Sequence, residues 1–540
     1  MVEMSGLDPA DGLTKRRLFG LGTGLSLADD VYVETGLLGW ASPSQKVDIG
    51  ATGAVSETAD AGEVVIANVP PDISKPGPND ALLSYAWHGR RANLYWIPGR
   101  LWSGRTLMGW GVLEQPFGTV VSRSSGGRLT FGLRDPRQSL EAPFQPSKFM
   151  GTNVGPVGVE GGPDLKGRPK PVLYGTASNI PAPRVNESLL VYQVADRVAS
   201  VLCVRDGASA LTAGVLRASL AGLTANSPTP GRYDVYAGAE GTFIRLGTTP
   251  FFGINVDASE GAAAANRSHA RLWERIRLER CGSTAADISA AATTAAHNAD
   301  AAEAGFWWGT EATRKAALDE VLFGFGAFET QALDGTWRPI KLTLPSGTSV
   351  IDLAVLTPSS VFVAKTRELL ELQRVRPNYA PGGVPPYRVS VRWGKNYEVM
   401  SASQFAGVAP KRLQDKFDDE WRIETVINSA VWDPATNTGM FQNAPELTVE
   451  SGYIPGADGV SSPAAAGEAA RLLAMLSTVR GQYQTSFAPQ IGDVLLNGDV
   501  VRLTYGGMGL SGGKLFRILQ NGLVVNRAGA QMDLVIGLEA

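Results

Sequence analysis

The segment Gly309–Leu344 reads GTEATRKAALDEVLFGFGAFETQALDGTWRPIKLTL, and it predicts a helix followed by a hairpin. Apolar residues recur at steps of three and four positions, which places one apolar stripe along one face of a helix. This stripe consists of Ala317, Leu318, Val321, Leu322 and Phe325. Thr310 is the expected N-cap, and Gly324 and Gly326 are expected to end the helix.

The dipeptide Asp334-Gly335 predicts a tight turn between two strands, Ala327–Leu333 and Thr336–Leu344. In the second strand, we expect Ile340, Leu342 and Leu344 to pack on one face, with Lys341 and Thr343 in water on the other. The whole segment therefore predicts an α+β unit inside the chain.

The composition indicates a large globular protein with many turns. At 540 residues the chain has room for about three or four domains. Hydrophobic residues make up 44% and charged residues 19%, and the 63 glycines and 33 prolines favour short strands broken by turns. The formal net charge of −3 gives no basic field for sequence-specific nucleic-acid binding.

We predict a mainly β fold with an α+β insert, in which two or more antiparallel β-barrel or sandwich domains are joined by a helical segment. Strand-like runs separated by turn residues precede residue 150, among them Ala81–Trp87 and Thr119–Ser122, and alanine-rich helices begin near Ala258. A later helix is expected at Pro463–Arg480, capped by Ser461 or Ser462, with Ala469, Leu472, Leu473 and Leu476 on one face. The expected divisions are an N-terminal arm (1–30), a first barrel (31–150), a connector with strands of the second barrel (151–255), a helical insert (256–345) and the remainder of the second barrel with two helices (346–540).

The N-terminal region allows a second interpretation. Lys15-Arg16-Arg17-Leu18-Phe19 and the mild apolar stretch to Ala28 are similar to a twin-arginine export signal, with Ser26-Leu27-Ala28 as a cleavage site. No apolar run approaches the roughly 18 residues that a membrane span needs, so we expect no membrane-spanning helix. The basic runs Lys15–Arg17 and Arg90-Arg91 are most simply solvated faces.

One motif resembles a hydrolase signature. Gly509-Leu510-Ser511-Gly512-Gly513 matches G-x-S-x-G, the nucleophile elbow of serine hydrolases. That elbow lies between a strand and a helix and needs a histidine later in the chain, whereas strand-like segments flank this motif and the last histidine is His297. We therefore predict a glycine-rich loop.

The remaining candidates for chemistry are few. Glu114, Asp135 and Glu141 are the acids that we name for paired-carboxylate glycoside chemistry, and solvated surface acids are the simpler interpretation. Cys203 and Cys281 are far apart and have no metal spacing, and the three histidines are not paired with metal ligands. We therefore expect no catalytic, cofactor-binding or metal-binding residues, and we expect that the protein is not an enzyme.

An aromatic cluster in the first predicted barrel has two interpretations. It consists of Trp87, Tyr95, Trp96, Trp102 and Trp110. Such a cluster is more often core or subunit interface than a platform for sugars, and both alternatives stay open here.

Several motifs together resemble baseplate hub proteins from the tail tip of long-tailed phages, the siphophage and Mu-like groups, and of gene transfer agents. They are A-x-F-E-T (Ala327–Thr330) with D-G-T-W-R-P-I-K (Asp334–Lys341), Tyr85-x-Trp87-x-Gly89-Arg90, Trp102-x-Gly104, the connector Gly158–Gly175, Tyr387–Tyr397 and Gly506–Arg517. The connector is the most specific of these motifs, and the resemblance starts near residue 60.

This resemblance implies a structural virion protein that forms a homotrimeric ring at the tail tip. The ring would join the tail tube and distal tail protein to the central fibre or spike, and help to open the path for DNA. Implied partners are the tail tube and distal tail proteins, the central fibre, other hub proteins and the C-terminus of the tape measure protein. The resemblance also implies synthesis in the host cytoplasm. Iron–sulfur sites of some related tails are not expected here, because only two isolated cysteines are present. The alternative is a secreted β-rich protein that binds or cleaves carbohydrate.

Overall fold

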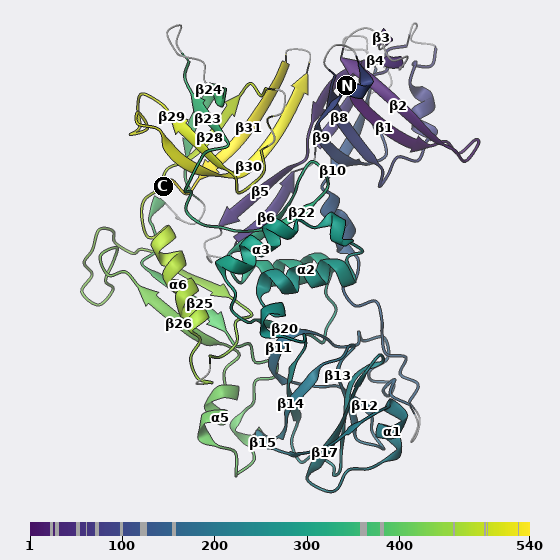
Figure 1. Cartoon of the computed structure of the whole chain (residues 1–540), viewed down its shortest axis with the longest axis vertical. Helices are drawn as coiled ribbons and strands as arrows, with labels where there is room; N and C mark the ends of the chain where they lie inside the picture. Colours follow the sequence, from purple (N-terminus) through teal and green to yellow (C-terminus); the bar gives the residue numbers. More distant parts are fainter. Residues whose placement is uncertain are drawn as a thin grey trace.

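The structure is a computed structural model with two barrels at one end, a helical insert in the middle and a β-sandwich at the other end (Figure 1). The N-terminus lies in the first barrel, and the C-terminus lies close to the second barrel. The structure describes residues 1–540 except 22–24, 27–31, 50–54, 61, 71–74, 98–100, 119–126, 154–157, 357–363, 378–382, 457–458, 491–492, 494 and 527–528.

The first barrel is a closed ring of seven strands in the order β2-β1-β8-β9-β10-β7-β4, and parallel pairing of β2 with β4 closes it. Alternate residues point inward, as in β1, where Val2 and Met4 are fully buried. The strands are β1 (Val2–Leu7), β2 (Thr14–Leu21), β4 (Tyr32–Ala41), β7 (Gly62–Ala67), β8 (Arg91–Trp96), β9 (Thr106–Leu113) and β10 (Arg128–Arg134), and β3 (Leu25–Ser26) pairs with β4.

The N-terminal residues form part of this barrel, so the expected separate arm over 1–30 needs correction. The basic run that resembles an export signal lies within β2, where Arg16 pairs with Glu3 and Arg17 Nη1 lies 3.0 Å from Glu34 Oε1. All three basic residues of this run are exposed or half-buried, and the buried residues of the strand are the next two, Leu18 and Phe19. A second difference concerns the expected strand Ala81–Trp87, because the 3₁₀ helix Asp80–Ser84 occupies its first half. The expected strand Thr119–Ser122 lies outside the described residues.

The second barrel is a closed ring of six strands in the order β30-β29-β23-β24-β28-β31, closed by pairing of β31 with β30. Its strands come from two distant parts of the chain. They are β23 (Ile351–Ala354), β24 (Thr366–Val375), β28 (Gln482–Phe487), β29 (Val500–Thr504), β30 (Lys514–Asn526) and β31 (Gly529–Gly537).

Main-chain hydrogen bonds join the two barrels edge to edge. The far half of β30 pairs with β4 at Val524↔Ala41, and its middle pairs with β5 (Ser44–Ile49) at Gln520↔Lys46. The hairpin of β5 and β6 (Val55–Asp60) then reaches the insert, where Val47 joins the core around α2 and α4. One cluster of buried residues runs through both barrels, so they form a single packed unit.

Residues 172–259 form a two-sheet sandwich of their own, and the prediction that strands of 151–255 belong to the second barrel was wrong. Strand patterns indicate faces but not pairing partners. One sheet is β15-β14-β19-β11-β20 and the other is β12-β13-β18-β17-β16. The elements are β11 (Val172–Ile180), β12 (Arg184–Asn186), β13 (Val191–Ala195), β14 (Ser200–Asp206), β15 (Ser209–Ala210), β16 (Thr212–Arg217), α1 (Leu220–Ala225), β17 (Arg232–Gly238), β18 (Gly241–Leu246), β19 (Ile254–Ser259) and β20 (Gly305–Trp308).

The insert contains the predicted helix and hairpin. The helix is α4 (Arg314–Phe323), and its predicted apolar stripe is buried. Its cap is Thr313, whose side chain accepts a hydrogen bond from the Ala316 N–H, and not the predicted Thr310. The other elements are α2 (His269–Arg280), α3 (Ala290–Ala299), β21 (Ala327–Gln331) and β22 (Trp337–Lys341).

The prediction for the two faces of the second hairpin strand was partly wrong. Leu342 is fully buried as expected, but Lys341 is buried as well, while Ile340 is only partly buried. Lys341 is tolerated in the interior because two carboxylates from other elements meet its ammonium group there.

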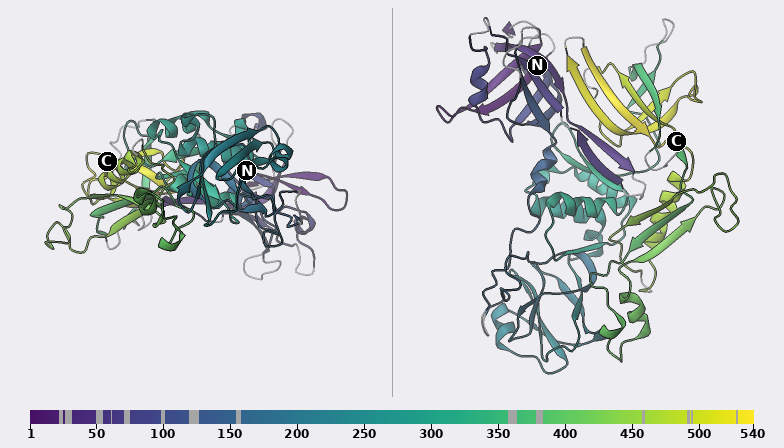
Figure 2. Two further views of the ribbon diagram at one scale, coloured as in Figure 1. Left: turned by 90° about the horizontal axis from the view of Figure 1, so that it is seen from below. Right: turned by 180° about the vertical axis from the view of Figure 1, so that it is seen from behind.

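A separate three-stranded sheet lies beside the insert under α6, which corrects the expectation that 346–540 belongs wholly to the second barrel. Figure 2 shows this sheet and α6 on the flank of the molecule. The predicted leucine face of α6 packs inward, with Ser462 as its N-cap. The elements are β25 (Arg388–Trp393), α5 (Lys411–Phe417), β26 (Arg422–Ile427), β27 (Glu446–Glu450) and α6 (Pro463–Leu476).

A buried ion pair fastens the hairpin to α2. Glu329 on β21 accepts hydrogen bonds from Arg277 Nε at 3.1 Å and from Trp273 Nε1 at 2.7 Å. Both charged side chains are 2% exposed, and the Arg277 guanidinium stacks on Trp337 at 3.7 Å. Arg277 holds the pKa of Glu329 below its usual value against the opposing effect of burial.

Glu329→Ala should destabilise the chain by about 3–5 kcal/mol, because it leaves Arg277 buried without this counter-charge. Urea unfolding followed by tryptophan fluorescence measures the change. The control is Asp415→Ala, which breaks the exposed Lys411–Asp415 pair and should cost less than about 1 kcal/mol. Equal losses in the two variants would show that the buried pair has no special role.

Candidate functional site

The three acids named from the sequence lie in three different local environments. Glu114 pairs with Arg134, and Asp135 accepts a hydrogen bond from Arg137 N–H at 2.8 Å and pairs with its guanidinium at 2.8 Å. Burial raises the pKa of Asp135 to about 6. Glu141 is exposed at the end of a 3₁₀ helix. The structure gives them local structural roles: an ion pair, a cap and a solvated acid.

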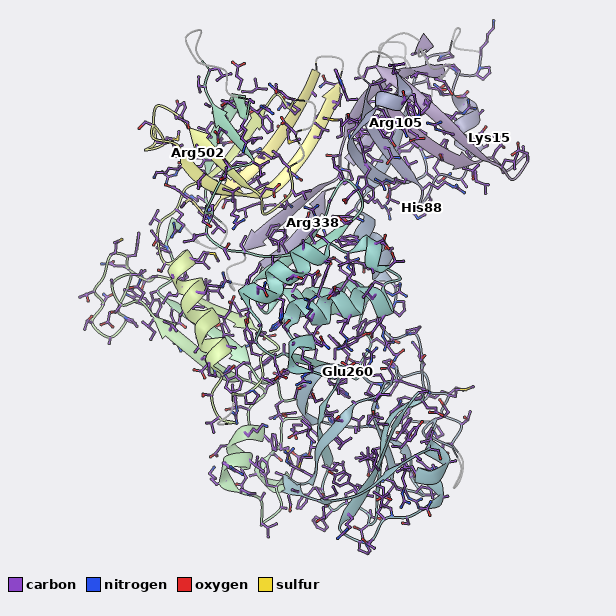
Figure 3. All side chains as sticks on the ribbon, in the orientation of Figure 1. Lys15, His88, Arg105, Glu260, Arg338 and Arg502 are labelled. Atoms are coloured by element: carbon purple, nitrogen blue, oxygen red, sulfur yellow. The ribbon has the colours of Figure 1, made fainter. Side chains whose placement is uncertain are left out.

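The G-x-S-x-G match lies in the loop between β29 and β30, as predicted. A strand follows it instead of a helix, and Gly513 lies against Arg502 of β29. Figure 3 shows His88 on the first barrel and Arg502 on the second, and the other two histidines belong to the insert. The local structure around Ser511 is therefore not that of a nucleophile elbow.

The cysteines Cys203 and Cys281 are both free thiols. Among the described residues, no group of three or more His, Cys, Asp and Glu side chains is placed to hold a metal ion. In the same residues, no helix combines the length and the apolar character that crossing a membrane requires.

The aromatic cluster of the first barrel divides between core and surface. Trp87 is fully buried and meets Phe131 edge to face at 5.3 Å. The guanidinium groups of Arg16 and Arg105 stack on the Trp102 ring at 4.4 and 4.3 Å, and that of Arg91 stacks on Trp110 at 4.3 Å. Arginine side chains therefore cover the Trp102 and Trp110 rings, which a sugar-binding platform would need to be free, while Trp96 remains 50% exposed.

A buried polar network connects the insert to α6. Lys341 Nζ lies 2.8 Å from Asp300 Oδ2 and 3.1 Å from Glu468 Oε2, and Tyr453 donates its hydroxyl proton to Asp300. Arg471 of α6 completes the network on Glu468. The sequence gives no sign of this network, because Asp300 and Lys341 meet Tyr453, Glu468 and Arg471 only in the fold.

His269 lies beside this network, stacked on Phe325 at 4.9 Å and fully buried. Burial lowers the pKa of His269 to about 4; Lys341 acts in the same direction, while Asp300 and Glu468 oppose it. Since the unfolded chain takes up this proton near pH 6.5 and the folded chain only near 4, stability is lost as the pH falls through this window.

His269→Leu should remove this acid sensitivity. We expect the parent chain to lose roughly 3 kcal/mol more than the variant between pH 7 and 4, from a shift of about 2.5 pH units. Urea midpoints measured across this pH range test the prediction, and His88→Gln on an exposed turn is the control. Parallel pH profiles for the parent and His269→Leu would contradict it.

The sandwich presents an open, apolar sheet edge. β16 is the outermost strand of its sheet, and Thr212 to Leu216 are all exposed on it. Val215 is 53% and Leu216 73% exposed, although open edges usually carry charge or proline. The buried Asp234 carboxylate accepts a hydrogen bond from Val215 N–H at 2.8 Å and holds the strand in place. This edge is ready to pair with another strand.

A second apolar feature lies at the same end of the molecule. Phe251 is 87% exposed in the loop between β18 and β19. The Asp206 carboxylate accepts hydrogen bonds from the N–H groups of Phe251 and Phe252 at 2.8 and 2.7 Å, which fixes the loop. Aromatic side chains, including phenylalanine, are enriched in protein interfaces relative to the rest of the surface. Together, β16 and Phe251 form the candidate assembly surface.

No family model matches this chain, and no curated protein matches it. Solved structures that resemble it include phage tail and baseplate proteins and an Escherichia coli component of the type VI secretion system. They include proteins of the kind that the sequence motifs resemble. A tail protein of Neisseria meningitidis is 10% identical with a TM-score of 0.36, covering 99% of this chain and 96% of that one.

Two further tail proteins show a similar degree of likeness. The prophage MuSo2 43 kDa tail protein of Shewanella oneidensis is 9% identical with a TM-score of 0.34, over 99% of this chain and 97% of that one. The prophage tail protein gp18 of Listeria monocytogenes is 8% identical with a TM-score of 0.32, over 99% and 94%.

Leu216→Lys should reduce association between chains while leaving the fold intact. The side chain is exposed, so the free energy of unfolding should change by less than about 0.5 kcal/mol. An edge lysine disfavours strand addition. Light scattering over a range of concentrations measures association, with Met508→Lys, on an exposed loop of the second barrel, as the control. Unchanged association in Leu216→Lys would exclude this edge as a contact between copies.

Proposed function

We propose that this chain is a structural virion protein, the baseplate hub at the tip of a phage tail. The observation that supports this best is that one chain holds two closed barrels fixed edge to edge by main-chain pairing. Three copies in a ring would present six barrels. Such a ring fits a sixfold tail tube on one side and a threefold fibre or spike on the other.

Each partner has a place in this proposal. The barrel end would face the tail tube, the distal tail protein and the C-terminus of the tape measure protein. The sandwich end, with β16 and Phe251, would face neighbouring copies in the ring, the central fibre or other hub proteins, because a ring of three chains would present these exposed features three times. The ring would help to open the path for DNA, and no enzymatic step is part of this role.

The secreted alternative makes a different physical demand. Cleavage after Ala28 would remove β1 and β2, two of the seven strands of the first barrel. The barrel would then open, and residues such as Met4 and Phe19 would leave a core in which they are fully buried. An intact first barrel therefore favours the hub over a protein cleaved at this position.

Purified protein should have a solution mass of three chains, or form rings when mixed with tail extract, and its N-terminus should be intact. Light scattering and N-terminal sequencing of one sample test both points. A stable monomer that begins near Asp29 would contradict the hub and favour the secreted carbohydrate-binding alternative.

A further inference from the structure

An arginine-lined pocket lies where β24 leaves the second barrel, beside the C-terminal end of α6. Its volume is about 270 Å³. Three arginines line it, Arg374, Arg376 and Arg480, and the described residues of its lining include no carboxylate side chain. The other lining residues are Val375, Pro377, Gly383, Pro385, Thr478 and Val479.

The three guanidinium groups are not neutralised by acids within the described part of the chain. Arg480 donates from Nε to the Met475 carbonyl at 3.0 Å and from Nη1 to the Glu539 carbonyl, so backbone oxygens hold it in place. Arg374 and Arg376 are exposed and make no ion pair with any described carboxylate. The Glu539 carboxylate is occupied by Gly481 N–H at 2.8 Å and by Lys514.

We propose that this pocket binds the carboxylate groups of an extended acidic peptide segment from a partner protein. Three positive charges without a carboxylate partner around one pocket favour the binding of an anion. Arginine binds carboxylates through two parallel hydrogen bonds. The walls between the arginines are valine and proline, which suit side chains that alternate between acidic and apolar. A nucleic-acid backbone offers no apolar groups to such walls, so the peptide fits better.

Backbone geometry preorganises the pocket for this ligand. Arg374 and Arg376 are two positions apart at the end of an extended strand, so their side chains leave the same face. Arg376 precedes Pro377, which restricts it to extended conformations. The backbone that carries these two arginines therefore needs little ordering on binding, and the ligand would lie across the end of the barrel.

The test is binding of a fluorescein-labelled Glu-Val-Glu-Val-Glu-Val peptide to the full chain, measured by fluorescence anisotropy. We expect binding that weakens with salt, and a loss of affinity of about fivefold or more in each of Arg374→Gln and Arg376→Gln. Arg412→Gln is the matched control, since it removes the same charge from an exposed site on α5 outside the pocket. Thermal unfolding checks that the variants fold.

Three results would overturn the proposal. They are absence of binding to the parent chain, equal loss of affinity in Arg412→Gln, and tighter binding of inorganic phosphate or a DNA duplex that depends on Arg374 and Arg376. The last result would assign the pocket to phosphate groups instead. Peptide binding and solution mass are separate measurements. The peptide can fail to bind a protein that forms a trimer, and it can bind a protein that stays a monomer.

Discussion

The rest of the structure depends on β30, a strand of the second barrel that also pairs with β4 of the first barrel. Along one side it pairs first with β29, then with β5 and finally with β4, while its other side pairs with β31. The register between β30 and β31 shifts between Ile518 and Gln520, where the partner on the other side of β30 changes from β29 to β5. Main-chain hydrogen bonds therefore set the relative position of the barrels, and side-chain changes on their surfaces leave it in place.

Buried charge gives the insert its specificity. Each strand of the hairpin carries one buried charged residue that meets a different helix, Glu329 with α2 and Lys341 with α6. Desolvation makes such pairs poor sources of stability, but a shifted hairpin would leave both charges unpaired in the interior. These pairs consequently favour one register for the hairpin and one position for α6.

Local signals in the sequence predicted the elements of the insert well. The apolar spacing of α4, the Asp334-Gly335 turn and the leucine face of α6 depend on neighbouring residues, and all three are found. The burial of Lys341 could not be predicted, because Glu468 is supplied by a distant helix. The pairing partners of the strands could not be predicted either, because side chains alternate with the same period in a sandwich and in a barrel. The arginine pocket was missed for the same reason, since Arg480 joins Arg374 only in the fold.

The two barrels differ in strand number, which limits how a ring of them could bind a sixfold tube. Barrels of seven and six strands would alternate around the ring, so neighbouring tube subunits would meet different surfaces. A rigid interface cannot match both surfaces equally, whereas exposed, adaptable side chains at the barrel ends can. The sandwich has no such conflict, because each of its surfaces would occur three times around a threefold axis. The fixed features β16 and Phe251 lie at that end, where a single repeated contact can be specific.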